Sequence, residues 1–228
     1  MTRTFVAILL AASLLWSAGC STVRVAERAP EQSLPPATNA LWTSLSDELA
    51  ADRFYLLNTG DEALEWRLRA IDSATQEIEL QTFLWAEDAV GHAVLARLIA
   101  AADRGVKVRI LLDDMFTVGE GRTIAATTSH PNIEFRIYNP FRKRPDSFAL
   151  RQLLNLVQFS RVDHRMHNKA MVVDSRAFIV GGRNLADEYF GHHDSGNFRD
   201  LEVVGTGPAA GAVSTTFDAY WNSPWALS

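Results

Sequence analysis

The 228-residue chain contains a single cysteine, Cys20, and carries fewer basic than acidic residues. One cysteine excludes an intramolecular disulfide and a metal cluster built from several thiolates. The 22 Lys and Arg against 27 Asp and Glu give a net charge of −5. This balance argues against a broad basic surface for a phosphate backbone, so nucleic acid is not the expected partner.

Its one long apolar run lies at the N-terminus. Arg3 precedes the apolar residues 5–16, and Ser17-Ala-Gly-Cys20 supplies a cleavage site of small residues. This pattern predicts a signal peptide over residues 1–19, because the run is too short for a spanning helix. We expect Cys20 to be lipidated. Ser17 stands where a bacterial lipobox normally carries Leu, which leaves ordinary cleavage or a retained anchor as alternatives.

The exported N-terminus indicates a location in the bacterial cell envelope. We expect a lipid-anchored protein that faces the periplasm and contacts the membrane through its anchor. Ser21 follows the cysteine and is not an acidic retention signal for the inner membrane. The outer membrane is therefore slightly favoured.

The rest of the chain divides into a tether and one domain. Residues 20–50 contain Pro30, Pro35 and Pro36 among small and charged residues and are predicted to be a tether and lead-in. Residues 51–228 alternate short apolar runs with helical periodicity, which predicts an α/β layered domain. The predicted strands are residues 54–58, 77–85, 106–113, 133–138, 170–174, 177–180 and 201–205. The predicted helices are residues 61–75, 91–104, 120–129, 151–159 and 208–221.

Two polar clusters outside the main motif also suggest roles. Glu77, Glu79 and Gln81 share one face of a predicted strand, where they would form a solvated surface or line a subsite. The run 142–144, Arg-Lys-Arg, lies in a predicted loop, where it would either be solvated, as such runs usually are, or contact anionic lipid headgroups.

The most informative segment is His167-Asn-Lys-Ala-Met-Val-Val-Asp174, which is followed by Gly181-Gly-Arg-Asn184. On a strand, His167 and Lys169 would share one surface. A neutral imidazole can attack phosphorus or transfer a proton, and an ammonium can hold the non-bridging oxygens. Asn184 can donate a further hydrogen bond, and the glycine pair permits close approach of a ligand. A lone His-x-Lys pair is usually only an exposed polar face, but the whole string predicts metal-free phosphodiester exchange.

This string, His167-x-Lys169, Asp174 and Gly181-Gly182-x-Asn184, resembles the HKD signature of the phospholipase D superfamily, which would span about residues 161–188. The resemblance extends from about Phe54 to Ser223. Segments 77–88, 104–114 and 130–141 are similar to the first half of bacterial cardiolipin synthases, and segments 198–207 and 217–223 are similar to those that close each catalytic half. The anchored N-terminus, together with residues 164–167 and 181–190, narrows the resemblance to the C type. The resemblance implies a mixed central sheet flanked by helices that carries a single catalytic half.

The resemblance also implies roles for the motif residues. His167 would form a phosphohistidine intermediate or protonate the leaving alcohol, and Lys169 and Asn184 would bind the phosphate oxygens. Asp200 would accept the imidazole Nδ1 proton. Asp174, the last residue of the catalytic motif, would support the turn and its polar neighbours. No metal or other cofactor is implied.

The implied activity is that of a phosphatidyltransferase on phospholipids of the phosphatidylglycerol or phosphatidylethanolamine class. Gly182 would belong to the substrate site; many relatives carry Ser there, so a hydroxyl contact to phosphate is absent. Related enzymes use two such histidines, yet no other histidine of this chain begins a His-x-Lys.

The second half of the site must then come from elsewhere. It is either a homodimer partner, as in single-motif phospholipases D and nucleases, or a missing C-terminal region. We favour the second, because the chain stops shortly after Trp221, where a first half would continue into the second. A third interpretation is an inactive, truncated lipoprotein that binds anionic lipid.

Overall fold

The computed structural model describes residues 28–45, 47–116, 129–145, 147–156, 161 and 163–228. The predicted signal peptide 1–19, Cys20 and nearly all of the predicted helix 120–129 lie outside the described residues. Among the helices described, none combines the length and the apolar character needed to cross a bilayer.

An eight-stranded mixed sheet forms the centre of the domain, in the order β1-β7-β6-β5-β2-β3-β4-β8. The β2–β3 and β3–β4 pairs are parallel and the other pairs are antiparallel. The strands are β1 (Arg53–Leu57), β2 (Glu77–Thr82), β3 (Lys107–Asp113), β4 (Ile133–Tyr138), β5 (Ala170–Val173), β6 (Ala177–Gly181), β7 (Glu202–Thr206) and β8 (Ala226–Leu227). The prediction of an α/β domain with a mixed central sheet is confirmed.

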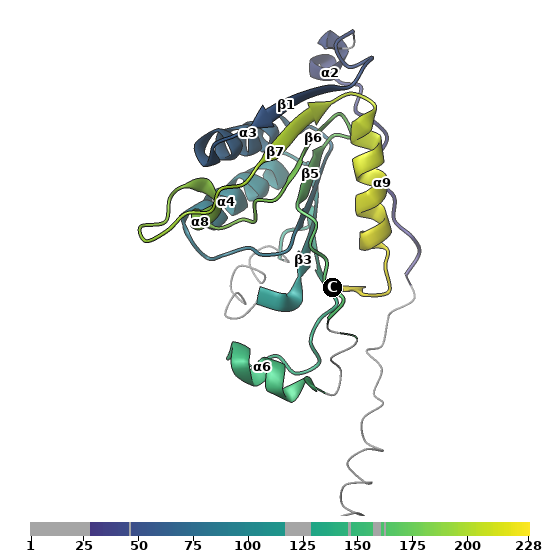
Figure 1. Ribbon diagram of the computed structural model, residues 1–228. Coiled ribbons are helices and arrows are strands. Elements are labelled where there is room, and N and C mark those ends of the chain that lie inside the picture. Colours follow the sequence, from purple (N-terminus) through teal and green to yellow (C-terminus); the bar gives the residue numbers. More distant parts are fainter. Residues whose placement is uncertain (1–27, 46, 117–128, 146, 157–160, 162) are drawn as a thin grey trace, which may run out of the picture.

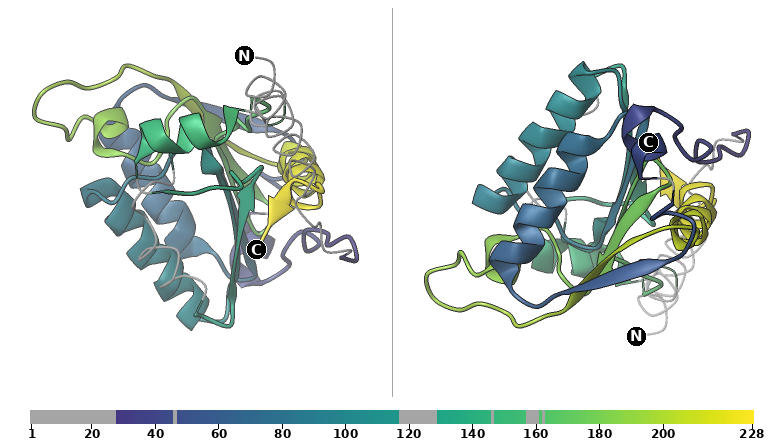
Figure 2. Two further views of the ribbon diagram at one scale, coloured as in Figure 1. Left: turned by 90° about the horizontal axis from the view of Figure 1, so that it is seen from below. Right: turned by 90° about the horizontal axis from the view of Figure 1, so that it is seen from above.

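Helices cover both faces of this sheet (Figures 1 and 2). α3 (Gly60–Ser73) and α4 (Ala89–Asp103) lie side by side on one face, and α9 (Ala209–Trp221) lies on the other. The side chains of Thr59 and Asp88 cap the first two helices by accepting backbone N–H groups. The shorter elements are α2 (Ala40–Ser44), η1 (Asp114–Phe116), α6 (Phe148–Leu154) and α8 (Asp187–Phe190).

The sheet face beneath α9 carries buried charges, which corrects the expectation of a solvated surface at Glu77 and Glu79. Both carboxylates are 2% exposed. The Arg109 guanidinium lies 2.9 Å from Glu77, 2.5 Å from Glu79 and 2.8 Å from Asp218 of α9. α9 therefore covers this face and supplies one of the charges, and each buried ion is paired.

Residues Glu31–Ala37, here called the N-terminal strap, belong to the predicted tether but pack against the domain. The Ser33 N–H donates to Asp218 (2.7 Å), and the Leu34 N–H donates to Glu77 (2.6 Å). Glu31 pairs with Lys107 and accepts from the indole of Trp221 (2.9 Å). This part of the segment is bound rather than extended into solvent, because buried carboxylates under α9 offer acceptors for its backbone.

Asp174 lies in the β5–β6 turn, at the opposite end of β5 from His167. Both Asp174 and Ser175 have positive φ angles, 55° and 51°, within the three-residue turn that joins the paired residues Val173 and Ala177. The Asp174 carboxylate accepts backbone N–H groups from residues 75–77 and the indole N–H of Trp42 at 2.8 Å. It is 2% exposed. It therefore ties the hairpin to the start of β2 and has no contact with His167.

We predict that Asp174→Ala lowers the free energy of unfolding by about 3 kcal/mol, because several buried donors lose their acceptor. Urea denaturation followed by circular dichroism measures this change. Asp194→Ala, at an exposed loop position, is the control and should change stability by less than about 0.5 kcal/mol. Equal effects of the two substitutions would contradict the assignment.

Candidate active site

His167 and Lys169 directly precede β5 and are carried to the end of β2 by the pairing of these two strands. Ala170 pairs with Gln81 in antiparallel register, so the residues before Ala170 lie beside those after Gln81. The His167 ring centroid is 4.6 Å from that of Phe83, and Lys169 Nζ is 5.1 Å from the same ring. Both side chains thus contact one aromatic surface.

Lys169 is 7% exposed, and its Nζ donates to the carbonyl of His167 at 2.8 Å. Burial lowers the pKa of Lys169 to about 8, while Asp200 and Asp113 oppose this shift by attracting the charged form. The Phe83 ring beneath it adds a cation–π contact. A desolvated ammonium of this kind gains much from an incoming anion.

The His167 side chain is exposed but sits beside this ammonium. Partial burial and the charge of Lys169 lower the pKa of His167, so the imidazole is neutral at neutral pH. It lies at a groove of about 420 Å³ between the start of β5 and α9. Gln81 also lines this groove, and its buried Nε2 has no hydrogen-bond partner among the described residues. Of the three polar residues on that strand face, Gln81 alone reaches the groove.

Asn184 follows β6 and is held at the end of β2 by its side chain. Its Oδ1 accepts the backbone N–H of Leu84 at 3.1 Å, and the side chain is 3% exposed. The neighbouring Leu185 forms a parallel bridge with Trp85, which fixes the segment further. Since the carbonyl oxygen is used, the amide N–H groups are left to donate to a ligand.

The Gly181-Gly182 pair is explained by close packing within the protein. A Cβ on Gly182 would lie 2.2 Å from Asp200 Oδ1, and a Cβ on Gly181 would lie 2.5 Å from the carbonyl oxygen of Leu201. The pair admits the chain that enters β7, whereas the predicted contact of Gly182 with substrate stays a prediction. The same packing leaves no space for a serine side chain at position 182.

Asp200 acts on Lys169 in this structure. Its Oδ1 accepts the N–H of Leu201 at 2.7 Å, and its charge raises the pKa of Lys169. Between the described side chains of Asp200 and His167 there is no hydrogen bond. The predicted acceptance of the imidazole proton is therefore not formed here, and the carboxylate instead favours the charged state of the lysine.

Arg183 and Phe83 contribute to the site without having been predicted. Arg183 is 2% exposed, and its guanidinium donates to the carbonyls of Tyr189 (3.1 Å), Leu57 (3.3 Å) and Asn58 (3.2 Å). It also donates to the carbonyl of Asp200, which positions that residue. The signal for Arg183 was its place within the Gly-Gly-Arg-Asn string; Phe83 is indistinguishable in sequence from a core residue.

Asp113 anchors the segment that leads into His167. Its carboxylate accepts the Met166 N–H at 2.8 Å and lies 3.1 Å from Arg165. Burial raises the pKa of Asp113 to about 6. Within the described ranges, no group of three or more His, Cys, Asp or Glu side chains is placed to hold a metal ion.

We predict that Gly182→Ala displaces Asp200 and lowers the free energy of unfolding by about 1–3 kcal/mol through overpacking. The control is Gly211→Ala in α9, where a Cβ would meet nothing within 4 Å, and it should be neutral or stabilising by up to about 1 kcal/mol. Thermal unfolding of both variants measures the difference. A neutral Gly182→Ala would show that Asp200 is not held against this glycine.

The chain is similar in sequence to known proteins. The sequence model of the family described as "Cardiolipin synthase, PLD-like domain" matches residues 68–221. Cardiolipin synthase C of Escherichia coli strain K12 is 41% identical over 160 residues, which are 70% of this chain and 33% of that protein. Cardiolipin synthase B of the same strain is 32% identical over 157 residues, 69% of this chain and 35% of that protein. The chain thus spans about a third of the length of these curated relatives.

Among solved structures, NucT from Helicobacter pylori superposes with a TM-score of 0.57 at 14% identity, and the match covers 78% of this chain and 99% of that one. Such a low identity establishes the shared fold alone. The fold, the motif geometry and the family match over most of the domain lead to one conclusion: the chain belongs to the phospholipase D superfamily, in its cardiolipin synthase-like domain family.

Proposed function

We propose that this chain carries one catalytic half of a phosphatidyltransferase that acts on phospholipid phosphodiesters. The observation that carries the proposal is the pair formed by a neutral His167 and a desolvated Lys169 on the Phe83 ring. A nucleophile and an anion-binding group are thereby held together at an open groove. The cardiolipin synthases among the relatives support a phospholipid as the substrate.

In the proposed first step, Nε2 of His167 forms a bond to phosphorus and the bond from phosphorus to the headgroup alcohol breaks. Lys169 Nζ and the amide N–H groups of Asn184 hold the non-bridging oxygens. The departing oxygen takes a proton from an acid on the opposite side of the phosphate. In the second step a hydroxyl of another phospholipid gives its proton back to that acid, attacks phosphorus and releases His167; this product is cardiolipin, whereas attack by water gives phosphatidic acid.

The acid on the opposite side is assigned to a second histidine that this chain does not supply. Its sequence has one His-x-Lys pair, and the curated relatives are about three times as long as the matched region. We propose that the other half comes from further sequence of the same protein. In a homodimer it would come instead from His167 of a second copy.

We further propose that Cys20 anchors the protein on the periplasmic side of the envelope, where donor and acceptor would be phospholipids of the phosphatidylglycerol or phosphatidylethanolamine class.

We predict that His167→Ala abolishes transfer, with a loss of at least about a thousandfold. Lys169→Ala and Asn184→Ala should each lower kcat by about a hundredfold, because transition-state charge is held less well. Two quantities are measured: turnover of radiolabelled phosphatidylglycerol, and acid-labile label on the protein. Each variant is assayed together with the same second half of the site that gives activity with the wild-type chain. His193→Ala, at an exposed loop position, is the control and should retain full activity. Undiminished turnover in the His167 variant would refute the proposal.

We also predict a bell-shaped pH dependence of kcat/KM. The pKa of His167 is lowered below 6.5, so activity rises as the imidazole loses its proton in that range. Activity falls again as Lys169 loses its proton near pH 8. Lys169→Arg should remove the alkaline limb, because a guanidinium stays protonated. Asn184→Ala is the control: it should lower the rate and keep both limbs. An alkaline limb that survives in Lys169→Arg would assign it to another group.

A further inference from the structure

α6 is oriented with its charge inward and its apolar side chains outward. Arg151 is 2% exposed, whereas Leu150 and Leu153 on the same helix are 43% and 62% exposed. Phe148, Leu154 and, just beyond the helix, Leu156 are also exposed. A surface helix of a soluble domain normally shows the reverse arrangement. Exposed apolar residues gathered in this way indicate a surface that contacts something else.

The inward arginine is what holds α6 in this orientation. Arg151 donates to the backbone carbonyl of Asp114 at 3.0 Å, and its guanidinium lies over the Phe141 ring at 5.6 Å. Asp114 in turn accepts the N–H of Phe141 at 2.7 Å. The helix is therefore fixed to the end of β3 through a buried polar contact. The leucines face away because Arg151 occupies the side of the helix that faces the domain.

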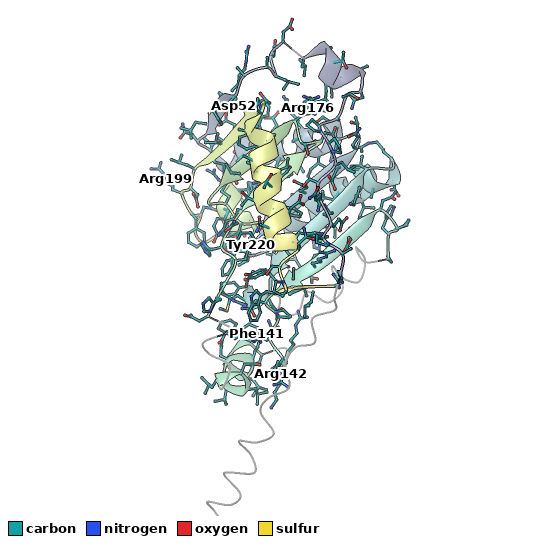
Figure 3. The ribbon with its side chains drawn as sticks, turned by 90° about the vertical axis from the view of Figure 1, so that its right-hand side faces the viewer. Asp52, Phe141, Arg142, Arg176, Arg199 and Tyr220 are labelled. Carbon is teal, nitrogen blue, oxygen red and sulfur yellow. The ribbon has the colours of Figure 1, made fainter. Side chains whose placement is uncertain are left out.

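Positive charge accompanies the apolar side chains. Residues 139–169 contain seven Arg or Lys against two Asp, in a chain whose net charge is −5. Two of the seven, Arg151 and Lys169, are buried, and Arg144 lies 2.8 Å from Asp114. Arg142, Lys143 and Arg144 are exposed in the loop that precedes α6. Figure 3 shows Arg142 below the sheet, at the end of the domain that carries α6. Apolar side chains beside exposed cations match the surface of an anionic membrane, in which an apolar phase lies behind negative headgroups.

A row of aromatic rings connects this surface with the active site. The Phe148 ring of α6 stacks on Phe116 at a centroid distance of 5.8 Å and an interplanar angle of 7°. Phe116 meets Phe83 edge-on at 5.4 Å, and Phe83 lies 4.6 Å from the His167 ring. The apolar surface of α6 is thus continuous with the ring that supports the catalytic imidazole.

We propose that α6 and the basic residues 142–144 form a membrane-docking surface that binds anionic phospholipid bilayers and orients His167 toward the headgroups. Its apolar members are Phe148, Leu150, Leu153 and Leu154. The orientation of His167 toward substrate rests on the proposed function, whereas docking itself does not require turnover. The docking surface lies at the opposite end of the domain from α2 (Figure 1), so a bound membrane would leave α2 in water.

A fluorescent probe at one position tests this docking directly. In the full chain with Cys20→Ser, Leu153→Cys introduces a unique thiol for an environment-sensitive nitrobenzoxadiazole label. Vesicles of phosphatidylglycerol and phosphatidylcholine in equal amounts should increase its emission at least threefold and shift it to the blue. Leu41→Cys, at a position on α2 with 41% exposure, is the matched control and should not change. Absence of a change in the Leu153→Cys protein, or an equal change in both labelled proteins, would overturn the proposal.

The charge component is tested with the same probe. Arg142→Gln combined with Lys143→Gln should weaken binding to the anionic vesicles about tenfold or more, as expected for the loss of two cations near a charged surface. Equal binding by that variant would overturn the assignment of the basic residues. Emission that rises with protein concentration alone would show that a second copy covers α6. Emission that rises with duplex DNA and not with vesicles would assign nucleic acid instead. Either result would overturn membrane docking.

Docking and catalysis can fail separately. When His167→Ala is added to the labelled Leu153→Cys protein, the probe should still insert into vesicles while turnover is lost. Insertion in a protein that shows no turnover even with His167 intact would leave docking standing and refute the proposed function. Turnover without insertion of the probe on α6 would refute membrane docking and leave the proposed function standing. The Leu150→Gln, Leu153→Gln double variant should lose turnover of vesicle substrate at least tenfold and retain turnover of a water-soluble short-chain phosphodiester.

Discussion

The antiparallel pairing of β5 with β2 is the constraint on which the catalytic geometry depends. It places the residues before β5 against those after β2, so His167 and Lys169 meet the Phe83 ring. The other end of the same pair is fixed by Asp174, whose carboxylate accepts the backbone N–H groups that open β2. A shift of one residue would turn each side chain of β5 to the other face of the sheet. Asp174 therefore influences the active site indirectly, because it helps to fix the register of β5 against β2.

Lys169 shows that the fold keeps an unfavourable feature, a buried ammonium group, in the active site. Burial of the ammonium works against its charge, and the nearest compensation comes from the carboxylates of Asp200 and Asp113 and from an aromatic face. Neither carboxylate forms an ion pair with it among the described contacts. The lysine is therefore charged but incompletely satisfied, and a bound phosphate diester would supply the missing anion. Ionisable groups whose pKa is shifted by burial in this way are typical of active sites.

Much of this architecture could be predicted from the sequence, because the strands and the HKD string are local patterns. Seven strands followed from short apolar runs, whereas β8 and α8 were missed because two and four residues carry no periodicity. Buried Glu79 could not be predicted, since its partner Arg109 lies 30 residues away and Asp218 lies a further 109 residues along the chain. For the same reason the sequence could not reveal that Asp200 faces Gly182, or that α6 turns its arginine inward.

The N-terminal strap has a consequence for where the folded unit begins. Glu31 supplies the anion for Lys107 and the acceptor for the indole of Trp221, a core residue at the end of α9. A shortened chain that starts at β1 would keep every strand of the sheet and still leave the Trp221 indole N–H without this acceptor and Lys107 without its nearer carboxylate. The minimal autonomous unit is thus longer than its secondary structure suggests. Glu31 stands 190 positions away in sequence from the tryptophan that it supports.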